Sequence, residues 1–278
     1  MRVRFLALLA ALSLLVLAAL PASASTSNPK FNPPKSFYLA LGDSLAFGYQ
    51  QSKFIANLPT ENPSAFVTGY VDDFAGMLQG IDPAIETVNL GCPDETTSSF
   101  MAGGCPYTDA GFRLHRAYGG AQLDAAINFL KSHPGQVSPI TIDLGANDAN
   151  SCGADQTCFA GAIATVRQNM GVILSMLRAA APGAEIIVME YYNPFAVLDP
   201  GTNAGAELLN SVLAGDAALV RGRTADAFTP FNLASDEPAT LCALTLFCTS
   251  LHDVHATDAG YLVIAQQFWS ASGYGRLG

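Results

Sequence analysis

The chain is poor in basic residues, and this shortage excludes several classes of partner. Its 278 residues include 13 Lys and Arg against 23 Asp and Glu, which gives a net charge of −10. An acidic protein with so few cations repels nucleic acid and anionic lipid headgroups. We therefore expect no nucleic-acid partner, and a substrate that is neutral or cationic.

Long apolar runs are also missing beyond the first two dozen residues. The run over 6–20 has 15 residues, whereas a membrane span needs roughly 20. Arg2 and Arg4 precede it, and the small residues of Pro21-Ala22-Ser23-Ala24 follow, a pattern typical of a signal peptide cleaved after Ala24. We predict a signal peptide over 1–24, no stable membrane anchor, and a secreted mature chain of 278 − 24 = 254 residues. Loss of the two arginines would change its charge from −10 to −12.

Patterns that bind metal ions are absent as well. No Cys-x-x-Cys occurs, and no histidine stands at ligand spacing beside a cysteine. The doublet Asp72-Asp73 has no further carboxylates at binding spacing, so we interpret it as a solvated helix face. Six cysteines in an exported chain indicate disulfides instead. Of the 15 possible connectivities, the short separations favour three local pairs, Cys92–Cys105, Cys152–Cys158 and Cys242–Cys248.

Segments with strand and helix character alternate through most of the chain. The predicted strands are 37–41, 85–89, 140–144, 186–191 and 223–228, and the predicted helices are 70–79, 120–132, 159–181, 203–219 and 257–270. Strands separated by helices imply parallel pairing. No repeat or shift of composition divides the chain, so we predict an extended leader (25–36), one domain (37–272) and a C-terminal tail (273–278). The connections over 50–68 and 92–119 are long, which is typical of functional or mobile loops; whether they cover a site stays open.

Four polar motifs follow predicted strands or begin a predicted helix. They are Gly42-Asp43-Ser44-Leu45, Asn89-Leu90-Gly91, Gly145-Ala146-Asn147-Asp148 and the segment 253–261, which contains Asp253 and His255. The carboxyl edge of a parallel sheet is where ligands bind in α/β proteins. Each motif alone would be interpreted as a turn or a helix cap, but four in order along one edge indicate a catalytic site.

In these motifs the chain resembles the GDSL, or SGNH, hydrolase family of serine esterases and lipases. Within it, the chain is similar to secreted actinobacterial-type members with three disulfides. The resemblance covers roughly residues 37–270. It implies a flavodoxin-like three-layer α/β/α sandwich with a mostly parallel sheet of about five strands.

The resemblance also implies a role for each site residue. Ser44 would be the nucleophile, His255 the general base and acid, and Asp253 the group that orients the imidazole. The oxyanion hole would consist of the Ser44 and Gly91 backbone N–H groups and the Asn147 side-chain amide. Such donors stabilise the oxyanion of a tetrahedral intermediate. No metal or organic cofactor is required by this chemistry.

One departure from the family pattern concerns the residue that orients His255. Many members place the acid three residues before the histidine, where this chain has His252. Asp253 lies only two residues before His255. Three groups therefore compete for the role: the Asp253 carboxylate, a backbone carbonyl and His252.

The expected function is hydrolysis of carboxylic esters through an acyl-enzyme, by a monomer acting on a small-molecule or lipid ester. Lipids, phospholipids and acetylated polysaccharide are alternative substrates of the same fold, and a non-catalytic binding domain is the alternative from another class. Four phenylalanines near the motifs could line an acyl site or belong to the core, which is the commoner environment of phenylalanine. They are Phe47, Phe54, Phe66 and Phe100.

Overall fold

A five-stranded parallel sheet forms the centre of the molecule in the computed structural model, which describes residues 31–277. The strands are β1 (Phe37–Gly42), β2 (Glu86–Asn89), β3 (Val137–Asp143), β4 (Ile186–Glu190) and β5 (Arg223–Asp226). Their order is β2-β1-β3-β4-β5, and every pair is parallel. This flavodoxin-like order reverses direction between β1 and β3, where doubly wound folds bind their ligands. The predicted signal peptide, 1–24, lies outside the described residues.

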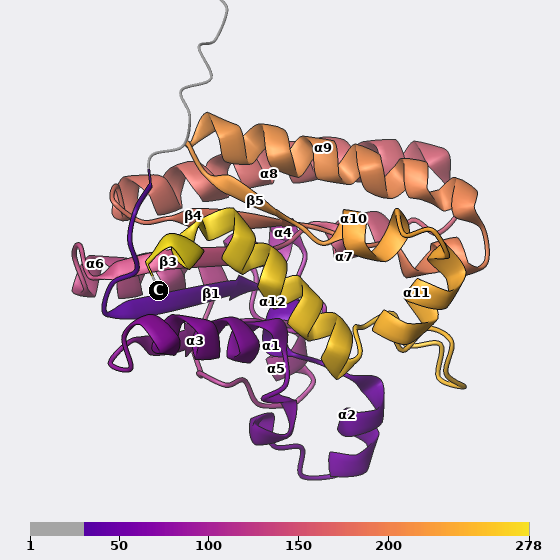
Figure 1. The fold of residues 1–278 in the computed structure, drawn as a ribbon, viewed down its shortest axis with the longest axis horizontal. Coiled ribbons are helices and arrows are strands. Elements are labelled where there is room, and N and C mark those ends of the chain that lie inside the picture. The colour runs from indigo at the N-terminus through magenta and orange to yellow at the C-terminus, as the bar shows by residue number, and fades with distance from the viewer. Residues whose placement is uncertain (1–30, 278) are drawn as a thin grey trace, which may run out of the picture.

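Helices cover both faces of the sheet (Figure 1). α3 (Tyr70–Ile81) and α12 (Asp258–Ser272) pack together on one face. α8 (Gln156–Ala180) and α9 (Asn203–Leu219) pack together on the other, where α6 (Gln122–Ser132) contacts α8. The predicted three-layer α/β/α architecture is therefore confirmed.

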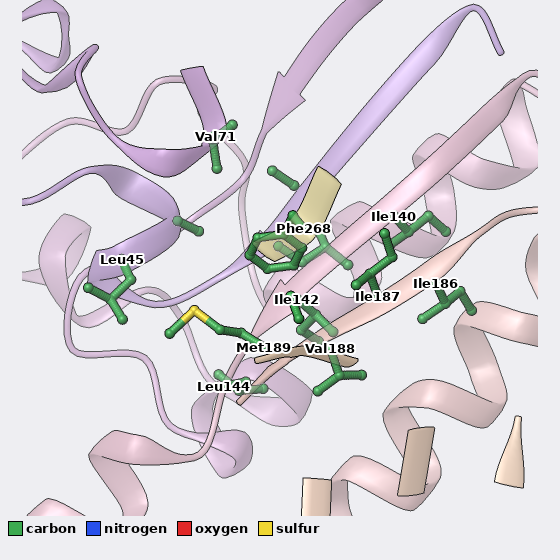
Figure 2. Packing of buried hydrophobic residues seen from close by; sticks show 14 of the residues in the cluster. Leu45, Val71, Ile140, Ile142, Leu144, Ile186, Ile187, Val188, Met189 and Phe268 are labelled. Atoms are coloured by element: carbon green, nitrogen blue, oxygen red, sulfur yellow. The ribbon is translucent and has the colours of Figure 1, made fainter. Parts of the chain in front are cut away.

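The core follows from the composition of the central strands. All seven residues of β3 are buried, and so are the first four of β4. Strands of a parallel sheet are covered on both faces, so they carry continuous apolar runs such as Ile186-Ile187-Val188. Figure 2 shows Ile142 and Met189 from these strands with Phe268 of α12 in the same cluster.

Short helices form in segments where the sequence predicted neither a helix nor a strand. They are α1 (Ser44–Phe47), α2 (Gln51–Asn57), η1 (Pro63–Phe66), α4 (Thr97–Ala102), α5 (Pro106–Asp109), α7 (Ala146–Asn150), η2 (Pro194–Val197), η3 (Pro200–Thr202), α10 (Phe228–Asn232), α11 (Glu237–Leu244) and η4 (Tyr274–Arg276). The predicted strand 223–228 is too long, because β5 ends at Asp226 and α10 begins at Phe228.

Both ends of the described chain pack against the domain. Residues 31–36 form neither helix nor strand, and the Asn32 backbone N–H donates to Glu185 Oε2 at 3.0 Å. The Phe31 ring meets the edge of Tyr274, which is fully buried. Within residues 31–277, no helix combines the length and apolarity that crossing a bilayer requires.

The structure contains the three predicted disulfides. Their Cα atoms are 5.8 Å apart in Cys92–Cys105, 5.4 Å in Cys152–Cys158 and 5.2 Å in Cys242–Cys248. These distances are within the usual range of protein disulfides. Each bridge closes a short connection near the carboxyl edge of the sheet, where the candidate site residues lie.

Candidate active site

Ser44 stands at the carboxyl end of β1, as the first residue of α1. The turn into α1 depends on Gly42, whose φ is +138° and whose Cβ, if present, would lie 2.3 Å from the Asp143 carbonyl oxygen. The Asp43 side chain caps the helix by accepting the Leu45 N–H at 2.9 Å. The Ser44 backbone N–H has no acceptor within residues 31–277. The hydroxyl and the backbone N–H of Ser44 therefore lie together at the carboxyl edge of the sheet.

His255 and Asp253 reach Ser44 from the loop before α12. His255 Nε2 lies 2.8 Å from Ser44 Oγ, and His255 Nδ1 lies 2.5 Å from Asp253 Oδ1. Since a carboxylate only accepts, Nδ1 carries the proton and Nε2 is left to accept from the serine hydroxyl. The other Asp253 oxygen accepts the Gln51 N–H at 2.8 Å.

The electrostatic state of Asp253 suits a group that holds a histidine. Burial by itself would raise the pKa of Asp253, but the hydrogen bond and charge of His255, together with the Gln51 N–H, outweigh it. The pKa of Asp253 therefore falls below its ordinary value, and the carboxylate is ionised at neutral pH.

His252, the competing orienter, lies elsewhere. Its backbone has a left-handed φ of +46°, and its exposed ring contacts the Phe247 carbonyl at 3.2 Å. Of the three candidate groups, the structure brings only the Asp253 carboxylate to His255 Nδ1.

Asn147, the predicted side-chain donor, lies on α7 and lines the same cavity as Ser44 and His255. Its Nδ2 donates to the Glu95 carbonyl at 2.9 Å. An amide nitrogen carries two hydrogens, so one remains for a ligand.

Gly91 is placed differently from the other predicted donors. Its N–H donates to Asn89 Oδ1 at 2.9 Å. A Cβ on Gly91 would lie 2.7 Å from the Phe47 nitrogen, so glycine is needed there for α1 to pack closely. The structure thus explains the glycine by packing, while the N–H predicted for the oxyanion is already bonded.

The backbone N–H of Asp94 is a further candidate donor, which the sequence did not predict. Cys92 to Glu95 form a turn closed by the Glu95 N–H to the Cys92 carbonyl at 3.2 Å, with Pro93 second and Asp94 third. Asp94 has φ +65°, which fits a type II turn. The Asp94 N–H has no acceptor within residues 31–277. The carbonyl of the next residue, Glu95, accepts the hydrogen bond from the Asn147 side chain. The Pro-Asp pair was a signal for this turn.

Two buried carboxylates lie directly behind the nucleophile. Asp143, at the end of β3, accepts the Ala46 N–H at 3.1 Å and the Tyr70 hydroxyl at 2.5 Å. Asp43 accepts the Tyr191 hydroxyl at 3.0 Å. Burial raises the pKa of both carboxyls, and for Asp143 the neighbouring charge of Asp43 adds to the rise. Together they fix the turn that carries Ser44. Asp143 was missed because it ends a buried strand in the sequence.

Gln122 connects the nucleophile turn to the segment that holds Asn147. Its side chain accepts the Gly42 N–H at 2.8 Å and donates to the Gly42 carbonyl at 2.9 Å. It also donates to Glu95 Oε2 at 3.1 Å. The side chain is buried at the first turn of α6, so these bonds are shielded from water.

We expect Gln122→Met to destabilise the fold by about 2–4 kcal/mol. Methionine keeps the volume but cannot accept the buried Gly42 N–H or donate to Glu95, whereas the Gly42 carbonyl still accepts the Cys92 N–H. Urea unfolding would measure this. The exposed Gln156→Met serves as control and should stay within about 0.5 kcal/mol of wild type. Equal stability of Gln122→Met and wild type would contradict the bridging role.

Burial raises the pKa of Glu95 to about 7, against the hydrogen bonds from Ser99 and Gln122, and the Asp43 carboxylate adds to the rise. A raised folded-state pKa stabilises the protein below the unfolded-state pKa, and this contribution disappears as pH rises through about 7. The free energy of unfolding at pH 5 minus that at pH 8 measures this contribution. We expect this difference to be about 1–3 kcal/mol smaller in Glu95→Gln than in wild type. An unchanged difference, measured by urea unfolding at both pH values, would contradict this.

Comparison with known proteins identifies the family of the chain. The profile of the GDSL-like lipase/acylhydrolase family matches residues 40–263. The chain belongs to this family. Membership makes the protein a carboxylic ester hydrolase, as the motifs predicted. Comparison with curated protein sequences gives no significant match.

Solved structures share the fold of this GDSL-family chain. Axe2, an acetylxylan esterase from Geobacillus stearothermophilus, is 18% identical with a TM-score of 0.58, covering 88% of this chain and 97% of its own. LAE5, an α/β hydrolase from the metagenome of Lake Arreo, is 17% identical with a TM-score of 0.55, covering 86% and 96%. At these identities the likeness concerns the fold alone.

Within residues 31–277, no group of three or more His, Cys, Asp or Glu side chains is arranged to hold a metal ion. The four phenylalanines considered as an acyl site are also placed elsewhere. Phe47, Phe66 and Phe100 are fully buried, and Phe54 packs against the cluster that contains Phe47. None of them lines the cavity beside Ser44.

Proposed function

We propose that this protein is a secreted serine esterase in which Ser44 is the nucleophile. The observation that carries the proposal is the continuous chain of contacts from Ser44 Oγ to His255 to Asp253, at 2.8 and 2.5 Å. An ionised carboxylate behind an imidazole that faces a serine hydroxyl is the arrangement that activates serine in acyl transfer.

In the proposed reaction, Ser44 Oγ attacks the ester carbonyl carbon while its proton moves to His255 Nε2. The tetrahedral intermediate collapses as the imidazolium returns this proton to the leaving alkoxide, so the alcohol departs and an acyl-serine remains. Water then attacks the acyl-serine while its proton moves to His255. The second tetrahedral intermediate collapses by breaking its bond to Ser44 Oγ, which takes the proton back from the imidazolium as the acid is released. Asp253 stabilises the imidazolium in both halves.

The oxyanion needs donors that point toward Ser44. The Ser44 N–H and the second hydrogen of Asn147 Nδ2 are free to bind it. For a third donor we favour the Asp94 N–H over the predicted Gly91 N–H, which Asn89 occupies. A structure with a phosphonate on Ser44 would test this: its oxygen should lie within about 3 Å of the Asp94 nitrogen. Contact with the Gly91 nitrogen instead would restore the original assignment.

Export is supported by the N-terminal pattern and by the three disulfides, which form in oxidising compartments. N-terminal sequencing of protein from the culture medium should begin at Ser25. Protein retained in the cytoplasm with an intact N-terminus would contradict secretion.

Hydrolysis of nitrophenyl esters by the purified, oxidised protein tests the enzymatic proposal. We expect release of nitrophenol from carboxylic esters and none from the phosphate monoester, because the site offers a nucleophile and neutral donors but no cation for a dianion. Inactivity on every carboxylic ester would favour the non-catalytic binding domain.

A further inference from the structure

The cavity beside Ser44 has a volume of about 590 Å³, well inside the range that holds drug-sized ligands. One wall comes from α7 and the start of α8, and the other from η2, η3 and α9. The two walls meet where Gly205 of α9 faces the Phe159 ring, 3.3 Å from where a Cβ would stand. An acetyl group would leave most of this space empty.

Most of the polar groups deep in the cavity are already bonded to protein. The Tyr191 hydroxyl donates to Asp43, and the Tyr192 hydroxyl donates to the Val254 carbonyl at 2.8 Å. Asn193 Nδ2 donates to Thr202 and Asn203, while its Oδ1 accepts the Phe195 N–H. A polar ligand would therefore lose its hydrogen bonds to water and gain few from the protein. An apolar ligand makes no hydrogen bonds to water and does not pay this cost.

Apart from Asn150 and Gln156, the other side chains that line the cavity are largely apolar. Phe159, Phe195, Leu198 and Leu209 line the cavity. Leu198 is 76% exposed, so this apolar side chain is accessible to a ligand that enters the cavity. Phe195 packs edge-on against Phe247, in the loop closed by the Cys242–Cys248 disulfide, so this wall is braced from behind.

The charges of the cavity also limit its ligand. Among the described residues that line it, none is Lys or Arg, and the acidic ones are Asp43 and Asp199. A phosphate or a carboxylate in the acyl chain would find no cation and would be repelled.

We infer that this cavity binds the uncharged hydrocarbon chain of the acyl group, so that the enzyme prefers medium-chain esters over acetate. The inference rests on the proposed function, since it assumes that the acyl carbonyl is presented to Ser44. Each methylene buried between Phe159 and Leu209 should raise kcat/KM by up to about fourfold. The acetyl group of an acetylated sugar, in contrast, is too short to bury methylene groups against these walls.

The test compares nitrophenyl acetate, butyrate, octanoate and laurate with wild type and Ala206→Trp. Ala206 lines the cavity on α9, so tryptophan there would fill the chain site. Wild type should favour octanoate over acetate by at least about tenfold in kcat/KM. The variant should lose this preference by at least about tenfold, because octanoate hydrolysis falls much more than acetate hydrolysis.

Ala204→Trp is the matched control, because Ala204 is exposed on the same helix and does not line the cavity. It should keep the wild-type chain profile. If Ala206→Trp unfolds, Ala206→Leu gives a smaller shift in the same direction. A wild-type preference for acetate, or an unchanged profile in a folded Ala206 variant, would overturn the acyl-chain inference but not the esterase. Inactivity of wild type on all four esters would instead overturn the proposed function.

Discussion

Ser44→Ala is expected to lower kcat for ester hydrolysis by about 10⁵–10⁶-fold, because the acyl-enzyme cannot form without the Ser44 oxygen. The residual rate would come from the oxyanion donors and substrate binding. Stability should stay within about 0.5 kcal/mol of wild type, since Ser44 is only partly buried and the partner of its hydroxyl is the side chain of His255. Paired kcat and thermal unfolding measurements check both parts.

A matched control for this substitution lies nearby in sequence. Ser52→Ala changes the same atoms on α2, at a position that is exposed and outside the cavity. It should leave kcat within about twofold of wild type. Turnover by Ser44→Ala within about tenfold of wild type would remove Ser44 from the mechanism.

Asp253→Asn should lower kcat by about 10²–10⁴-fold with little change in KM. The asparagine can satisfy the Gln51 N–H, but its amide would present a donor or a neutral acceptor to His255 Nδ1. Either the wrong tautomer forms or the imidazolium loses its counter-charge, and both costs appear chiefly in the transition state. Steady-state kinetics at saturating and limiting ester separate kcat from KM.

The pH dependence of stability gives this substitution a second readout. The folded-state pKa of Asp253 is lowered, so its contribution to stability is present above the unfolded-state pKa and disappears as pH falls through the folded-state value. Asp253→Asn should therefore flatten the acid limb of the stability curve. His252→Ala, the neighbouring control, should alter neither kcat nor this limb. A kinetically silent Asp253→Asn would mean that backbone alone holds His255.

The fold was predictable because its long elements carry strong patterns. Ile186-Ile187-Val188 has too many β-branched residues for a loop, and the stripe of Leu123, Ile127 and Leu130 repeats with helical spacing. The short helices could not be predicted, because three to eight residues carry little periodicity. Their ends depend on side-chain caps such as Thr96, which accepts the Ser99 N–H at 3.1 Å.

The site was predictable where chemistry and chain order coincide. Ser44, Asn147 and His255 each follow a strand or precede a helix in the order of the family, and the structure brings them to one cavity. The role of Gln122 could not be predicted, because its partners Gly42 and Glu95 come from distant segments. Such contacts depend on how α6 packs against the sheet, which no local pattern encodes.

Covalent labelling tests the central claim, that Ser44 is the nucleophile, most directly. The native enzyme would be treated with an alkyl nitrophenyl phosphonate, digested with its disulfides intact, and mapped by tandem mass spectrometry. One phosphonyl group per chain is expected on Ser44, with loss of esterase activity in proportion to labelling and no label on Ser44→Ala. Labelling of another serine that tracks the loss of activity, or full inactivation with Ser44 unmodified, would contradict the account.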